Sequence, residues 1–120
     1  MLVGGIEIYE TYNAGAVTGI YLQTPAHVWQ CVYNAEPVVI QHSRLFRPAL
    51  MTTDFPTNRV RLELNCTAAN DWCEIDAVKL LPASTQLSKS RLHHVSSFAR
   101  AVVHSFEFPI IFFVGILTAN

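Results

Sequence analysis

The carboxylate pair Glu74 and Asp76 is the closest approach in this sequence to a metal-binding or catalytic arrangement. Two residues apart on an extended strand, the side chains point to the same face, and carboxylate oxygens are ligands that Ca²⁺ prefers. A calcium site needs several more oxygen ligands, whereas Lys79 lies close enough in sequence to form a salt bridge. We therefore expect a structural role for this pair, and we interpret Glu7 and Glu10 in the same way.

Motifs of nucleophilic, zinc and phosphate-binding enzymes are missing from the sequence. It contains no Gly-x-Ser-x-Gly, His-Glu-x-x-His, P-loop or Gly-x-Gly-x-x-Gly pattern, and no pairing of a nucleophile with a base is visible. His93 and His94 are adjacent and so point in different directions, and His104 lies about three helical turns further along. We predict that the protein is not an enzyme and uses no metal or cofactor.

Two of the three cysteines bracket a short turn. Cys66 and Cys73 are separated by six residues, and a disulfide would require their Cα atoms to lie within about 7 Å. Asn65-Cys66-Thr67 matches the glycosylation sequon. The first residues lack a basic region, and Glu7 and Glu10 interrupt any apolar run, so no secretory signal is expected. We favour free thiols and an intracellular location, with the Cys66–Cys73 disulfide and a glycan on Asn65 as the alternative.

A binding surface is the most promising functional prediction. We predict that one set of residues forms this surface: Tyr12, Asn13, Trp29, Arg59 and Arg61. The set combines aromatic side chains, which can stack on a ligand, with polar groups, which can select it. A structural interpretation competes with this one. Trp29 falls in the middle of a predicted strand, where a tryptophan is usually buried, and Arg59 and Arg61 have Glu63 as a nearby ion-pair partner.

These residues are positioned by strands and turns. The clearest strand is Arg59–Asn65, in which Val60, Leu62 and Leu64 alternate with polar residues and so define one buried face. Further strands are predicted from alternation and β-branched content at Val3–Tyr9, Ala16–Gln23, His27–Tyr33, Val38–Ile40, Leu45–Phe46 and Trp72–Leu81. Turns are expected at Thr11–Gly15, Asn34–Pro37 and Asp54–Asn58.

Composition and strand spacing together predict an all-β sandwich or jelly roll. The 120 residues are enough for one domain, and a content of 51% hydrophobic and 14% charged residues excludes a disordered chain. A formal net charge of −1 gives no attraction to nucleic acid, so no nucleic-acid partner is expected. Six or seven short strands at regular spacing are typical of two-sheet folds.

The chain changes character at Pro82, where a serine-rich stretch begins. Residues 1–82 carry a formal net charge of −3 and are predicted to form the folded body, and residues 83–120 carry +2 and are predicted to form an irregular or helical tail. Apolar residues from Leu92 to Phe106 recur at helical spacing among basic residues, and Phe108–Ala119 is uncharged. Twelve residues cannot span a bilayer alone, so the alternatives are contact with a membrane surface and a segment that belongs to no fold.

Three segments carry a resemblance to a known family: Ile6–Val17, Phe55–Asn65 and Glu74–Leu80. In this order they resemble the discoidin-like (galactose-binding-like) domain that precedes the F-box and leucine-rich repeats in F-box/LRR-repeat proteins. The resemblance implies a partial jelly-roll β-sandwich that lacks its opening strands. It also implies a role in substrate selection for a Skp1–cullin–F-box ubiquitin ligase, and a location in the cytoplasm, nucleus or mitochondrion.

The sequence departs from that family after Leu81, where neither an F-box nor leucine-rich repeats follow. We therefore expect a fragment that binds protein partners without recruiting Skp1, and we expect residues 1–82 to be marginally stable in isolation. The rival hypothesis is a secreted, lectin-like module that binds carbohydrate, with Asn65 glycosylated and Cys66 bridged to Cys73.

Overall fold

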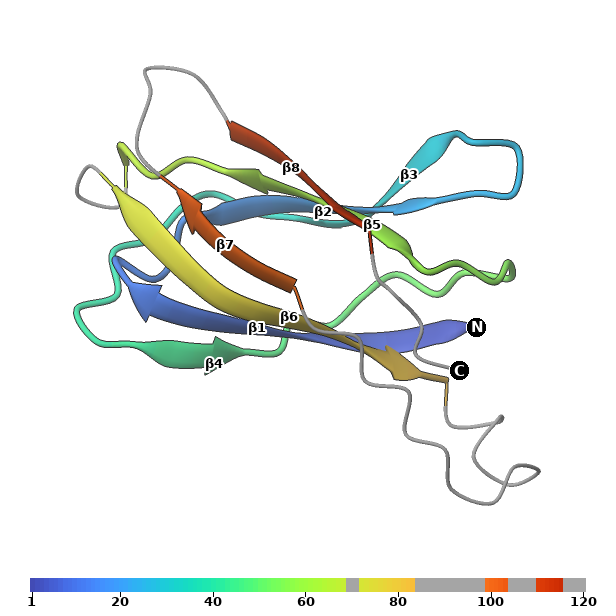
Figure 1. The fold of residues 1–120 in the computed structure, drawn as a ribbon, viewed down its shortest axis with the longest axis horizontal. Helices are drawn as coiled ribbons and strands as arrows, with labels where there is room; N and C mark the ends of the chain where they lie inside the picture. Colours follow the sequence, from blue (N-terminus) through green and yellow to red (C-terminus); the bar gives the residue numbers. More distant parts are fainter. Residues whose placement is uncertain (69–71, 84–98, 104–109, 116–120) are drawn as a thin grey trace.

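A computed structural model describes residues 1–68, 72–83, 99–103 and 110–115 of the chain. The described part contains eight β-strands and no helix, which confirms the all-β prediction (Figure 1). The strands are β1 (Val3–Tyr12), β2 (Val17–Gln23), β3 (Trp29–Asn34), β4 (Arg44–Phe46), β5 (Arg59–Leu64), β6 (Cys73–Pro82), β7 (Ala99–Val103) and β8 (Ile110–Gly115).

The strands form two antiparallel sheets of four. The first sheet has the order β4-β1-β6-β7 and the second has the order β3-β2-β5-β8. The sheets lie as two layers (Figure 1), and one hydrophobic core cluster draws its residues from both of them. The largest fully buried side chains include Ile6 and Ile8 from β1, Ile20 from β2, and Leu62 and Leu64 from β5. A two-layer sandwich therefore buries the apolar face of each sheet.

Alternation in the sequence determines which side chains face this core. Along β5, Val60, Leu62 and Leu64 are buried, whereas Arg59 is exposed and Arg61 is half-buried, as the period of two predicts. The longest pair, β1 and β6, runs from Val3 opposite Pro82 to Tyr12 opposite Glu74, with irregularities that shift its register. A register shift turns the side chains that follow it toward the other face.

The turn between β1 and β2 is held in a conformation that requires glycine. Gly15 has a φ of +100°, and a Cβ atom there would lie 2.0 Å from the carbonyl oxygen of Val38. Asn13 also adopts a positive φ, of +46°, which asparagine tolerates better than most residues. The amide of Val38 donates to the Gly15 carbonyl, and the amide of Ile40 donates to the Ala14 carbonyl. The segment predicted as a strand at Val38–Ile40 is thus an isolated bridge that packs against this turn.

The predicted tail contributes a strand to each sheet. β7 pairs with β6 in the first sheet, and β8 pairs with β5 in the second. The helical interpretation is wrong at Ala99–Val103, where the backbone is extended, because pairing with β6 supplies backbone hydrogen bonds that the local spacing does not reveal. The remainder of the predicted helix and the serine-rich stretch lie outside the described residues. Within the described part of the chain, no helix has the length and apolar character needed to cross a membrane.

Candidate functional site

Four side chains gather on the outer face of the second sheet, and we call them the Arg61 cluster: Tyr21, Trp29, Arg61 and Glu63. They come from three neighbouring strands, β2, β3 and β5. Tyr21 lies opposite Arg61 in the β2–β5 pairing, and Trp29 lies opposite Gln23 in the β2–β3 pairing. Neighbouring strands thus bring together residues that are up to 42 positions apart in the chain.

Arg61 lies at the centre of this cluster. Its guanidinium carbon is 4.0 Å from the ring centroid of Tyr21 and 5.6 Å from that of Trp29, both within cation–π range. Its Nη2 atom donates to Glu63 Oε1 at 3.1 Å, and the Tyr21 hydroxyl donates to Glu63 Oε2 at 3.2 Å. Each member therefore restrains at least one other member.

One donor of Arg61 is buried without a hydrogen bond. Among the residues that the structure describes, the Arg61 Nε atom is one of two buried side-chain polar atoms that have no hydrogen-bond partner. The side chain as a whole is 19% exposed and that of Glu63 is 26% exposed. The ion pair is therefore only partly solvated, and Arg61 keeps an unused donor beside two aromatic rings.

The environment of Tyr21 favours its neutral phenol. Partial burial of the ring raises the pKa of Tyr21 above its ordinary value, and the charge of Glu63 together with the hydrogen bond to that carboxylate adds to the shift. The folded structure thus favours the protonated hydroxyl of Tyr21, which donates to Glu63.

The predicted residues Tyr12 and Asn13 lie elsewhere, at the end of β1. Tyr12 is 44% exposed and stacks on Trp72, with ring centroids 4.2 Å apart and an angle of 23° between the planes. The side-chain amide of Asn13 donates to the carbonyl oxygen of Trp72. This arrangement joins the β1–β2 turn to the start of β6.

The structure therefore divides the predicted binding set into two groups. Tyr12 and Asn13 lie just before Val17, the first residue of β2, which is opposite Leu64 of β5. Trp29 is opposite Gln23, the last residue of β2. Arg59, exposed at the start of β5, belongs to the same end as Trp29. Trp29 is half-buried rather than fully buried, and Arg61 pairs with Glu63 as the structural interpretation expected.

Sequence reasoning missed Tyr21 and Trp72 as members of these groups. Tyr21 alternates with the buried Ile20 and Leu22, so its outward position is visible in the sequence, but its contact with Arg61 depends on the β2–β5 register. Trp72 directly precedes Cys73, and its stacking on Tyr12 depends on the pairing of β1 with β6.

Cys66 and Cys73 are joined by a disulfide, so the expectation of free thiols is wrong for these two residues in this structure. Their Cα atoms are 5.5 Å apart, within the range that a bridge requires, and both residues are buried. Cys31 is a free thiol. The sequon residue Asn65 is exposed, and its side-chain oxygen accepts a hydrogen bond from the amide of Ala68.

The carboxylates considered as metal ligands have partners of other kinds. Glu7 pairs with Arg47 and Glu10 pairs with Arg44, while Glu74 accepts a hydrogen bond from the Thr11 hydroxyl at 3.4 Å. In the described ranges, no group of three or more histidine, cysteine or acidic residues is placed to hold a metal ion.

Comparison with known proteins shows a similarity to a curated protein. The chain is 34% identical over 86 residues to F-box/LRR-repeat protein 4 from Bos taurus, and this alignment covers 62% of the chain and 14% of the bovine protein. No family model matches the chain, and no solved structure matches it. The expected resemblance to an F-box/LRR-repeat protein is thus confirmed as a distant similarity to a short part of one such protein.

Proposed function

We propose that this chain is a non-catalytic, protein-binding β-sandwich module of the discoidin-like type. The observation that carries the proposal is the similarity to an F-box/LRR-repeat protein, whose name describes two modules that act through protein contacts. The β-sandwich architecture supports the same proposal, since two packed sheets offer broad outer faces. In this proposal the related full-length protein selects substrates for a Skp1–cullin–F-box ubiquitin ligase.

The Arg61 cluster is the proposed partner-binding face. Tryptophan, tyrosine and arginine are the residues that most often dominate the free energy of protein binding, and here all three are in contact. Their mutual contacts restrain the side chains before a partner arrives, so less conformational entropy is lost on binding. Arg59, which is exposed at the start of β5, adds a positive charge that can steer an acidic partner surface.

Further elements of this proposal concern partners and location. The 120 residues contain no F-box, so we expect them not to bind Skp1. We propose an intracellular location, in the cytoplasm, nucleus or mitochondrion, because this is what the family resemblance implies.

A competition experiment tests the proposed function. Proteins captured by tagged F-box/LRR-repeat protein 4 are quantified with and without an excess of this chain. We expect the wild-type chain to displace at least one captured protein. Trp29→Ala and Arg59→Glu should weaken that displacement, and Tyr12→Ala, at the other end of β2, is the control that leaves it unchanged. Displacement of no captured protein would reject the proposal.

A secreted, lectin-like module remains the second candidate because two observations favour it. The Cys66–Cys73 disulfide is typical of oxidising compartments, and the Asn65 sequon is exposed. Expression in a secretory system followed by glycosidase treatment discriminates between the two functions. A mass shift that Asn65→Gln abolishes, combined with binding on a glycan array, would favour the lectin-like function.

A further inference from the structure

We propose that the Cys66–Cys73 disulfide is a redox switch that controls the contact between the aromatic rings of Tyr12 and Trp72. A dithiol reductant opens the bridge by thiol–disulfide exchange. The dithiol gives up two electrons and becomes a disulfide, and its two protons end on the sulfurs of Cys66 and Cys73. Opening the bridge weakens the ring contact, and closing the bridge strengthens it. The switch uses no residue of the Arg61 cluster, so this inference does not rest on the proposed function.

The disulfide joins the two sheets at one end of the sandwich. Cys66 lies two residues after the end of β5 in the second sheet, and Cys73 is the first residue of β6 in the first sheet. The chain beside Cys66 is anchored to the second sheet, because the Asn65 amide donates to the Ala16 carbonyl at 2.8 Å. Both cysteines belong to the buried core cluster. The bridge therefore fixes the start of β6 relative to the end of β5.

The ring contact fixes the same start of β6 to β1. Trp72 directly precedes Cys73, and its ring centroid lies 4.2 Å from that of Tyr12. Tyr12 is opposite Glu74 in the β1–β6 pairing, and the side-chain amide of Asn13 donates to the Trp72 carbonyl. A covalent anchor and a non-covalent anchor thus hold adjacent residues. When one anchor is in place, less conformational entropy is lost as the other forms, so each anchor strengthens the other.

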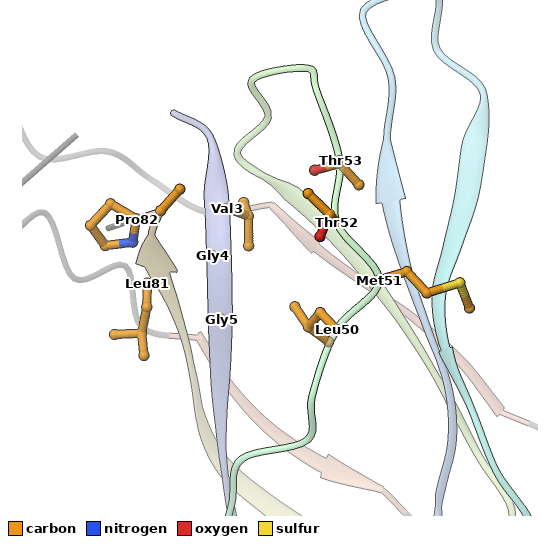
Figure 2. Close-up of a pocket in the computed structure, with 10 residues that line it drawn as sticks. Val3, Gly4, Gly5, Leu50, Met51, Thr52, Thr53, Leu81 and Pro82 are labelled. Carbon is orange, nitrogen blue, oxygen red and sulfur yellow. The ribbon is translucent and has the colours of Figure 1, made fainter. Parts of the chain in front are cut away.

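Reduction of the bridge should act locally rather than unfold the sandwich. The bridged cysteines are only seven positions apart, and a disulfide that closes a short loop restrains the unfolded chain less than one that closes a long loop. Buried residues of other strands, such as Ile8 and Leu62, belong to the same core. The hollow lined by Val3 and Leu81 lies at the opposite end of β1 and β6 (Figure 2), and its surroundings should stay unchanged.

Equilibrium reduction of the full chain tests the coupling between the two anchors. Because such coupling is reciprocal, loss of the Tyr12 ring should make the bridge easier to reduce. The chain is equilibrated in glutathione and dithiothreitol redox buffers, and the bridged fraction is measured by alkylation and mass spectrometry. Tyr12→Ala should raise the equilibrium constant for reduction about two- to tenfold, as one aromatic pair provides. Tyr12→Phe keeps the ring, and Tyr9→Ala removes a different ring from β1, so both should match the wild type.

Nuclear magnetic resonance of the oxidised and reduced wild-type chain shows the ring contact itself. Nuclear Overhauser effects between the Tyr12 and Trp72 rings should be present with the bridge closed and should weaken on reduction. The indole resonance of Trp29 and the methyl resonances of Leu81, both remote from the bridge, should keep their positions and so report intact sheets. Ring contacts that keep their full strength after reduction, an equilibrium constant that Tyr12→Ala leaves unchanged, or collapse of the Trp29 and Leu81 resonances to unfolded positions would overturn the inference.

Discussion

At the scale of single residues, two buried carboxylates of β1 pair with arginines in and directly after β4, the strand beside β1 in the first sheet. Glu10 is only 3% exposed, and it accepts hydrogen bonds from the Arg44 side chain and from the amide of Gly15. Glu7 accepts from Arg47 at 3.1 Å and from the Tyr9 hydroxyl at 3.1 Å. Because a buried charge is stable only when it is paired, both glutamates have structural roles.

Glu10→Ala should therefore be strongly destabilising. The substitution leaves the Arg44 guanidinium and the Gly15 amide without their acceptor, and we expect the free energy of unfolding to fall by about 2–4 kcal/mol. Urea denaturation followed by circular dichroism measures this change. Glu36→Ala, at an exposed position, is the matched control and should change the stability by no more than about 0.5 kcal/mol. Equal effects of the two substitutions would contradict the assigned role of Glu10.

Tyr21 gives a prediction about pH. Burial of the ring, followed by the charge and acceptor oxygen of Glu63, raises the pKa of Tyr21. Since the folded state then holds the phenol proton more tightly than the unfolded state, the resulting stability is fully present below about pH 10. It is lost as the pH rises through the raised pKa.

An absorbance titration of tyrosinate near 295 nm tests this prediction. Tyr9 is a second residue whose pKa is raised, mainly through its hydrogen bond to Glu7. Tyr21→Phe should remove one late-titrating group, and Glu63→Gln should bring the Tyr21 transition to lower pH, with the Tyr9 transition unchanged in both variants. A Tyr21 transition that stays in place in Glu63→Gln would show that the carboxylate does not influence the phenol.

At the scale of strands, the alternation of apolar and polar residues within a segment predicted most of the strands, but it did not predict which strands lie side by side. The alternation in Arg59–Leu64 reflects which side chains meet the core, and such burial is visible in the sequence of a single strand. The contact of Tyr21 and Trp29 with Arg61 depends on the pairing of β2 with both β3 and β5, which no single strand encodes. For the same reason the sequence could not show that Tyr12 and Trp29 lie at different ends of β2.

The turn between β1 and β2 supplies a prediction at this scale. Gly15→Ala would place a Cβ atom against the Val38 carbonyl at a backbone angle that alanine rarely adopts. We expect a loss of about 3 kcal/mol or more, measured by urea denaturation. Gly5→Ala is the matched control, because a Cβ atom there would lie at an ordinary contact distance of 3.4 Å from Leu81, and its effect should stay within about 1 kcal/mol. A mild effect of Gly15→Ala would mean that the turn adjusts freely.

At the scale of the whole molecule, the C-terminal strands change which strands form the edges of the two sheets. β7 lies beside β6 and β8 lies beside β5, so both β5 and β6 are interior strands. The sequence predicted an appendage after Pro82 because charge and serine content change there, and composition does not report long-range pairing. In the structure β6 ends at Pro82, and the described strands that follow pair with β6 and β5.

Removal of these strands should destabilise the remaining sheets. In a chain of residues 1–83, one side of β6 and one side of β5 would lose their backbone partners, and unpaired strand edges promote association between molecules. Relative to the full chain, we expect a melting temperature lower by at least about 10 °C, measured by circular dichroism, and a larger apparent mass by size-exclusion chromatography. Residues 1–115 are the control, because that chain keeps all eight described strands and should melt with the full chain. If residues 1–83 melt cooperatively at the same temperature and remain monomeric, the three remaining strands of each sheet do not depend on β7 and β8.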